Sequence, residues 1–220
     1  MKNWYLLALL FPFFIASCGG EAETANGVAA DSAKSATTAP AKKAVVDGKV
    51  SWLTIDQLEQ VAKTDKKKVM VDLYTSWCGW CKKMDKSTFQ HGQISQYLNE
   101  NFHAVKMDAE MKDNISFLGE DHAFKAAGRR GYNELAFKFA AGRMSYPTIA
   151  FLDEDLKRIN SFPGFKQPHQ FDPLLKFIAE NHYESTDFRS FSSSYDSPIA
   201  PVGSSKTAKK PRVQIKKNPS

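Results

Sequence analysis

Two cysteines separated by two residues are the part of this sequence best suited to chemistry. Cys78 and Cys81 stand in the run Trp77-Cys78-Gly79-Trp80-Cys81, between a short apolar stretch and a segment with helical spacing. At a helix N-terminus, free backbone N–H groups and the positive end of the dipole favour a thiolate over a thiol. We therefore expect a pair that forms and breaks a disulfide, with Cys78 as an exposed nucleophile and Cys81 as the more buried resolving thiol.

Other uses of a cysteine pair need further residues. A structural zinc site takes four ligands, and His91 and His103 are the available partners. Covalent haem attachment is excluded, because Lys82 stands where the haem motif requires His. A purely structural disulfide stays open, as does a copper site. The copper site would draw on four methionines, which are also common core residues: Met84, Met107, Met111 and Met144.

The N-terminal residues predict export. Lys2 precedes thirteen residues, 4–16, that are apolar except for Pro12. As a helix they reach about 20 Å, short of the ~30 Å hydrocarbon core, which favours a secretory signal over a spanning helix. Small residues then lead into Cys18, which resembles the lipobox of bacterial lipoproteins, where that Cys becomes acylated. We expect residues 1–17 to be a lipoprotein signal peptide; an ordinary signal peptide with an incidental Cys is the alternative.

Charge and composition separate the tails from the body. The formal net charge is +6, and residues 190–220 hold six basic side chains and one acidic one, so the body is nearly neutral. A basic nucleic-acid-binding domain is therefore disfavoured. Residues 18–50, rich in Ala, Thr and Ser, predict a flexible tether. Residues 186–220 predict a disordered basic tail, which is either simply solvated or attracted to anionic lipid.

The elements that must position the cysteines begin with an amphipathic helix capped by Thr54. Residues 69–74 carry one charge and predict a buried central strand, which leads into the cysteine run. A helix over residues 78–101, bent near 89–92, and a parallel strand over 102–107 follow. Both cysteines therefore lie where a strand turns into a helix.

The predicted domain spans residues 51–185. Its second half predicts a helix, a hairpin and a closing helix. Their ranges are 133–142 for the first helix, 148–152 and 158–162 for the hairpin strands, and 171–181 for the last helix. Between the two halves, residues 111–132 predict a β-hairpin excursion. The order of elements indicates an α/β domain with helices on both faces of a mixed sheet.

Two segments of the body resemble the thioredoxin superfamily. Residues 71–81 are similar to its active-site strand and motif, and the run Ser145-Tyr146-Pro147-Thr148 is similar to its cis-proline loop. The match covers roughly residues 52–183. Residues 77–84 and the run Pro163-Gly164-Phe165 most resemble exported members, akin to the C-terminal domain of the thiol:disulfide interchange protein. The whole chain resembles thioredoxin-like lipoproteins of Gram-negative bacteria.

The resemblance implies a thioredoxin-like fold: a mixed central sheet flanked by helices, with an insertion before the cis-Pro loop. It implies that Pro147 is cis and places the backbone of Tyr146 beside the cysteines, where an extended substrate can pair with it. Asp72 matches the family's buried acid, which relays a proton to or from Cys81. An exposed carboxylate on an edge strand is the alternative. Lys106 is the candidate partner of that acid.

Substrate contacts are expected from the residues around the cysteines. These are Trp77, Gly79, Trp80 and Tyr146, although Trp77 could instead serve core packing. Trp80 stands where cytosolic thioredoxins commonly have Pro, so the resemblance does not set the direction of electron flow. Residues 111–132 are absent from minimal thioredoxins, and we hypothesise that they overhang the cysteines and limit which substrates enter.

The resemblance implies a thiol–disulfide oxidoreductase of the cell envelope that acts on protein disulfides. No flavin or nicotinamide motif is present in the sequence, so we expect no cofactor, and electrons supplied by a membrane or periplasmic partner protein. The expected location is the periplasmic side of a membrane or the outer membrane, with lipid on Cys18 as the anchor. A redox-inactive or metal-binding adaptor lipoprotein on the same fold is the alternative.

Overall fold

A computed structural model describes residues 49–201 of the chain. The predicted signal peptide, Cys18 and nearly all of the predicted tether lie outside the described residues, as does the basic end of the tail. Within residues 49–201, no helix is both long enough and apolar enough to cross a membrane.

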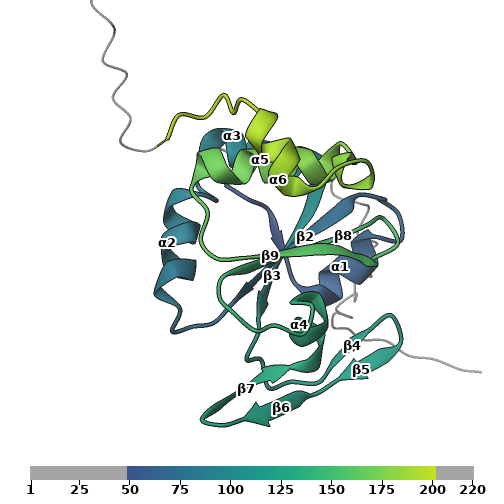
Figure 1. Cartoon of the computed structure of the whole chain (residues 1–220). Coiled ribbons are helices and arrows are strands. Elements are labelled where there is room, and N and C mark those ends of the chain that lie inside the picture. Colours follow the sequence, from purple (N-terminus) through teal and green to yellow (C-terminus); the bar gives the residue numbers. More distant parts are fainter. Residues whose placement is uncertain (1–48, 202–220) are drawn as a thin grey trace, which may run out of the picture. The chain divides into compact units, whose positions relative to one another are not determined.

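A mixed sheet lies between the helices at the centre of the domain (Figure 1). It has five strands in the order β1-β3-β2-β8-β9. The strands are β1 (Trp52–Leu53), β2 (Lys68–Tyr74), β3 (Phe102–Asp108), β8 (Thr148–Leu152) and β9 (Arg158–Pro163). The first three are parallel, and β8 is antiparallel to both β2 and β9. The predicted α/β class with a mixed sheet is confirmed.

The middle strand, β2, is buried on both faces. Its side chains alternate between the two cores, because successive residues of a strand point to opposite sides. Val71 and Leu73 belong to one core, and Met70 belongs to the other. Asp72 therefore shares the face of Met70.

Helices α1 (Ile55–Val61) and α4 (Glu134–Phe139) cover one face of the sheet (Figure 1). The predicted cap of α1 is confirmed: the backbone N–H of Gln57 donates to the Thr54 hydroxyl at 3.3 Å, and the Thr54 N–H donates to the Gln57 side chain at 2.9 Å. This capping box fixes where α1 starts, so that Leu58 reaches the core.

Helices α2 (Gly79–Ser87), α3 (Gly92–Asn101) and α5 (Pro168–Ala179) cover the opposite face. The single bent helix predicted over residues 78–101 is two helices in the structure, and the break between them, at residues 88–91, falls close to the predicted bend. Helix α5 starts at Pro168, three residues before the predicted start at residue 171. Proline suits the first turn of a helix, because its missing N–H would have no partner there.

The segment between β3 and α4 forms two hairpins where the sequence predicted one β-hairpin excursion. The first joins β4 (Ile115–Phe117) to β5 (Glu120–His122), and the second joins β6 (Phe124–Ala127) to β7 (Arg130–Asn133). Gly119 and Gly128 both take positive φ at the two turns.

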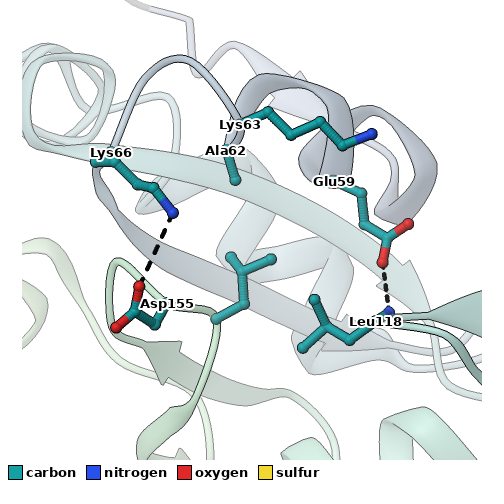
Figure 2. Close-up of a pocket in the computed structure, with 7 residues that line it drawn as sticks. Glu59, Ala62, Lys63, Lys66, Leu118 and Asp155 are labelled. Atoms are coloured by element: carbon teal, nitrogen blue, oxygen red, sulfur yellow. Dashed lines mark hydrogen bonds and ion pairs between the residues drawn. The ribbon is translucent and has the colours of Figure 1, made fainter.

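The first hairpin packs against α1. Figure 2 shows the N–H of Leu118, in the turn of this hairpin, donating to the Glu59 carboxylate of α1. The Lys66–Asp155 ion pair, 3.9 Å long, lies on the other side of the same shallow pocket. At the base of the insertion, the N–H of Asn133 donates to the carbonyl of Ala109 at 2.8 Å.

The prediction of a disordered tail is wrong for residues 186–201. A short 3-10 helix, η1 (His182–Glu184), leads to α6 (Phe188–Ser194), which packs on α5. The rings of Phe188 and Phe191 each lie 5.4 Å from that of Phe177. The average composition of the tail hid this helix, because its aromatic side chains at helical spacing are outnumbered by Ser and Lys.

Two hydroxyl groups tie the segment after α6 to α5. Tyr195 and Ser197 donate to the Asp172 carboxylate at 3.1 and 2.7 Å. Ile199 is buried in the same core as Phe177. The folded domain therefore extends well past the predicted boundary at residue 185.

Candidate active site

Cys78 and Cys81 form a disulfide at the start of α2, with their Cα atoms 5.3 Å apart. Cys78 is the N-cap of the helix, and its Sγ accepts the backbone N–H of Cys81 at 3.1 Å. Its own N–H donates to the carbonyl of Thr75 at 3.1 Å. On reduction, an N–H aimed at Sγ and the positive end of the helix both stabilise a thiolate on Cys78.

The expectation of an exposed Cys78 is wrong for the disulfide form. Cys78 is 4% exposed and Cys81 3%. The sulfur of Cys78 is bonded to that of Cys81 and accepts a hydrogen bond from the Cys81 N–H. The exposed surface of the motif belongs instead to Trp77 and Trp80, at 46% and 57%.

The cis-proline loop lies at the same end of the sheet as the cysteines. The Tyr146–Pro147 peptide bond is cis, as the resemblance implied. Thr148, which follows it, pairs with Leu73 near the end of β2, from which the chain runs on to Cys78. The rings of Trp77 and Tyr146 meet edge to face at 5.8 Å. This contact joins the cysteine motif to the proline loop.

Asp72 is a buried carboxylate in the central strand, which rules out the edge-strand alternative. It is 1% exposed and lies opposite Lys106 in the β2–β3 register. The Lys106 ammonium reaches Oδ2 at 3.3 Å, while Oδ1 has no hydrogen-bond partner among the described residues. Burial raises the pKa of Asp72 to about 6, Lys106 opposes this rise, and Asp85 adds to it.

Lys106 is shared between two carboxylates, which the sequence analysis missed. It pairs with Asp85 of α2 as well as with Asp72. Its ammonium also lies 5.0, 5.1 and 5.8 Å from the ring centres of Trp52, Tyr74 and Phe89. Asp85 lies one helical turn after Cys81, but no local pattern in the sequence links it to Lys106 in β3. The protonation of Asp72 therefore depends on the charges of Lys106 and Asp85.

Trp77 is held by two residues that the sequence analysis also missed. Its indole N–H donates to the Glu110 carboxylate at 2.9 Å, and the Arg130 guanidinium lies 3.9 Å from its ring centre. Arg130 and Glu110 pair at 3.6 Å. Since Arg130 belongs to β7, the second hairpin of the insertion contacts the cysteine motif, which accords with the hypothesis that it limits access.

Trp80 forms the other aromatic surface beside the cysteines. Its ring centre lies 5.3 Å from that of Phe165, and the Lys83 ammonium lies 4.8 Å from the Trp80 ring. Apart from its chain neighbours and the backbone of its own helix, no atom lies within 4 Å of the place a Cβ would take on Gly79. The surface between the two tryptophans is therefore open to a substrate chain.

The metal-site alternatives find little support within residues 49–201. No three His, Cys, Asp or Glu side chains there cluster as metal ligands. Met84 belongs to the core on one face of the sheet, whereas Met107 belongs to the other core, against which Met111 and Met144 also pack, so Met84 is separated from the other three. His103 is buried against the backbone carbonyl of Asp65, at 2.8 Å.

The sequence model of the thioredoxin-like domain family matches residues 55–179. The chain belongs to this family. The thioredoxin-like domain holds every element of the candidate site, from Asp72 to the cis-Pro loop. Its fold and dithiol pair are those of a thioredoxin-fold oxidoreductase.

Relatives of this thioredoxin-like chain include thiol:disulfide interchange proteins. DsbD of Pseudoalteromonas atlantica is 30% identical over 129 residues, 56% of this chain and 19% of DsbD. DsbD of Actinobacillus pleuropneumoniae is 31% identical over 115 residues, 51% of this chain and 16% of DsbD. The chain thus matches less than a fifth of either relative.

Among solved structures, a thioredoxin-fold protein from Helicobacter pylori is similar. It is 20% identical, with a TM-score of 0.46 over 58% of this chain and 83% of that protein.

Proposed function

We propose that this chain is an exported, lipid-anchored thiol–disulfide oxidoreductase that exchanges disulfides with protein substrates. One observation carries the proposal: a Cys78–Cys81 pair caps α2 with a backbone N–H on Sγ, and Trp77 joins it to the cis-proline loop. Thiolate stabilisation and a docking edge for a polypeptide are the two requirements of disulfide exchange with proteins.

The reaction begins when the Cys78 thiolate attacks one sulfur of a substrate disulfide. The other substrate sulfur leaves as a thiolate and takes a proton from water, so that a mixed disulfide joins Cys78 to the substrate. Cys81 then loses its proton and attacks Sγ of Cys78. The substrate's second sulfur leaves, the Cys78–Cys81 disulfide forms, and the substrate has gained two electrons.

Asp72 supplies the base for the second step. Its side chain lies on the face of β2 that α2 covers, and its pKa of about 6 lets it exist as a carboxylate or an acid near neutral pH. Lys106, held between Asp72 and Asp85, stabilises the carboxylate form. In the reverse direction, Asp72 returns the proton to Cys81.

Substrate polypeptides bind across the residues that surround the dithiol. The backbone of Tyr146 pairs with an extended segment, while Trp77, Gly79 and Trp80 provide an open aromatic surface. Electrons reach the oxidised pair from a partner protein of the envelope. The apolar N-terminal run and Cys18 support export and lipid attachment.

The enzyme activity is tested by the reduction of insulin with dithiothreitol as electron source. We expect turnover by the reduced protein that disappears in Cys78→Ser. Cys81→Ser should accumulate mixed disulfides with polypeptides, because it cannot resolve them. Wild-type protein without turnover or adducts would contradict the proposal and favour an adaptor.

The location is tested separately with Cys18→Ala in cells. We expect the wild-type chain to incorporate labelled palmitate and to fractionate with membranes. The variant should lose the label and the membrane association. A wild-type chain without label would contradict lipid attachment and leave the redox proposal untouched.

A further inference from the structure

A basic recess of about 500 Å³ lies beside Trp77, between the chain that follows β3 and the second hairpin. It is lined by Glu110, Lys112, Phe124, Arg129, Arg130 and Gly131. Three of these six residues are cationic and one is anionic.

The single anion of the recess is already engaged. Glu110 accepts the indole N–H of Trp77 and pairs with Arg130. Lys112 and Arg129 are exposed, and neither forms an ion pair with another residue of the range 49–201. The recess therefore has two cations in excess, and its charge complements carboxylates.

The recess continues the surface on which a substrate docks. Tyr146 precedes the cis proline and contacts Trp77, and Trp77 in turn stacks under Arg130. A polypeptide that pairs with the backbone of Tyr146 and presents its disulfide to Cys78 lies close to Trp77. On the side of Trp77 that faces Arg130, it meets the second hairpin.

Packing and a hydrogen bond fix the backbone of the second hairpin. The Phe124 ring lies across Gly131, only 2.1 Å from where a Cβ on that residue would stand. The ladder pairs Phe124 with Asn133, whose backbone N–H donates to the carbonyl of Ala109 at the base of the insertion. The turn that carries Arg129 therefore projects from a fixed base.

We propose that Lys112 and Arg129 bind an acidic segment of the polypeptide whose disulfide Cys78 attacks. The inference rests on the proposed function and names its substrate class: polypeptides with Asp or Glu close to the reactive cysteine. The carboxylates pair with Lys112 and Arg129, while the Arg130–Glu110 pair keeps Trp77 in position.

The test measures single-turnover rates of the reduced protein with three matched peptides. Each has one cysteine activated as a 2-thiopyridyl disulfide, whose uncharged leaving group is followed by absorbance. The residues flanking the cysteine are Asp and Glu, or Asn and Gln, or Lys. We expect the acidic peptide to react about fivefold faster than the amide peptide at low ionic strength, the size given by two exposed ion pairs. The lysine peptide should be slowest.

The variant Lys112→Ala/Arg129→Ala should bring the acidic-to-amide rate ratio close to one. The matched control is Lys63→Ala/Lys157→Ala, which removes the same charge at the other end of the sheet. Lys63 follows α1 just ahead of β2, and Lys157 lies in the turn after β8, which is antiparallel to β2. Both side chains are exposed, and the control should keep the preference.

Equal rates for acidic and amide peptides in the wild type would overturn the inference. It would also fall if the control lost as much preference as Lys112→Ala/Arg129→Ala, since net charge alone would then explain the effect. Failure of the proposed function looks different: the amide peptide itself would not react, or its rate would survive in Cys78→Ser.

Discussion

Replacing Asp72 by Asn should make the oxidised protein more stable at neutral pH. The carboxyl of Asp72 is fully buried, and burial raises its pKa from 3.8 to about 6 even though Lys106 lies 3.3 Å away. An acid whose pKa is higher in the folded protein than in the unfolded chain weakens the fold whenever it is ionised. Asn has nearly the same shape and cannot ionise.

The size of the effect follows from the shift. A rise from 3.8 to about 6 corresponds to about 3 kcal/mol, at about 1.4 kcal/mol per pKa unit. The penalty is absent below pH 3.8, grows between pH 4 and 6, and is constant above pH 6. Because the Asn amide is itself a buried polar group, we expect a net gain of about 1 to 3 kcal/mol at pH 8.

Urea unfolding of the oxidised protein at several pH values between 4 and 8 measures this gain. The difference between Asp72→Asn and wild type should be largest at pH 7 to 8 and shrink steadily below pH 6. Asp121→Asn is the matched control, since it removes the same charge from an exposed position on β5. A difference that does not vary with pH, or an Asp72→Asn protein less stable than wild type at pH 8, would refute the reasoning.

Three further outcomes are expected. In the wild type, the rate at which a peptide mixed disulfide is resolved, measured by stopped flow, should increase as pH rises through about 6. Asp72→Asn should lose this increase, and a rate that still increases near pH 6 would point to another base. Gly131→Ala should cost about 1 to 3 kcal/mol in urea unfolding because a Cβ meets the Phe124 ring, whereas Gly92→Ala, with open space, should cost little. Phe191→Ala should lower the free energy of unfolding by about 2 kcal/mol, since its ring packs against the core beside α5; an unchanged value would mean that α6 adds no stability.

Local patterns in the sequence predicted the elements that carry the dithiol. The apolar run that forms β2, the Thr54 cap and the bend between α2 and α3 all depend on neighbouring residues, so a single sequence suffices for them. The cis proline and the Lys106 partner of Asp72 came from the resemblance, and the structure has both.

Contacts between residues far apart in the sequence could not be predicted from such local patterns. Arg130 stacks on Trp77 across more than fifty residues of chain, and nothing local in either segment indicates it. Asp85 joins the Lys106 network only because α2 lies over the face of β2 that carries Asp72. In the tail, Phe188 and Phe191 were lost in an average over Ser and Lys, although their spacing marks one side of a helix.

A backbone hydrogen bond from the N–H of Asn133 to the carbonyl of Ala109 brings the two ends of the insertion together. The strands of the central sheet pair with one another and with no strand of the two hairpins. The hairpins are nevertheless coupled to the domain, because Ile115 and Phe117 fill part of the core beside α1 and Arg130 contacts Trp77. Exchanging residues 110–132 for a short turn would therefore cost core packing and would free the indole ring beside the reacting sulfurs.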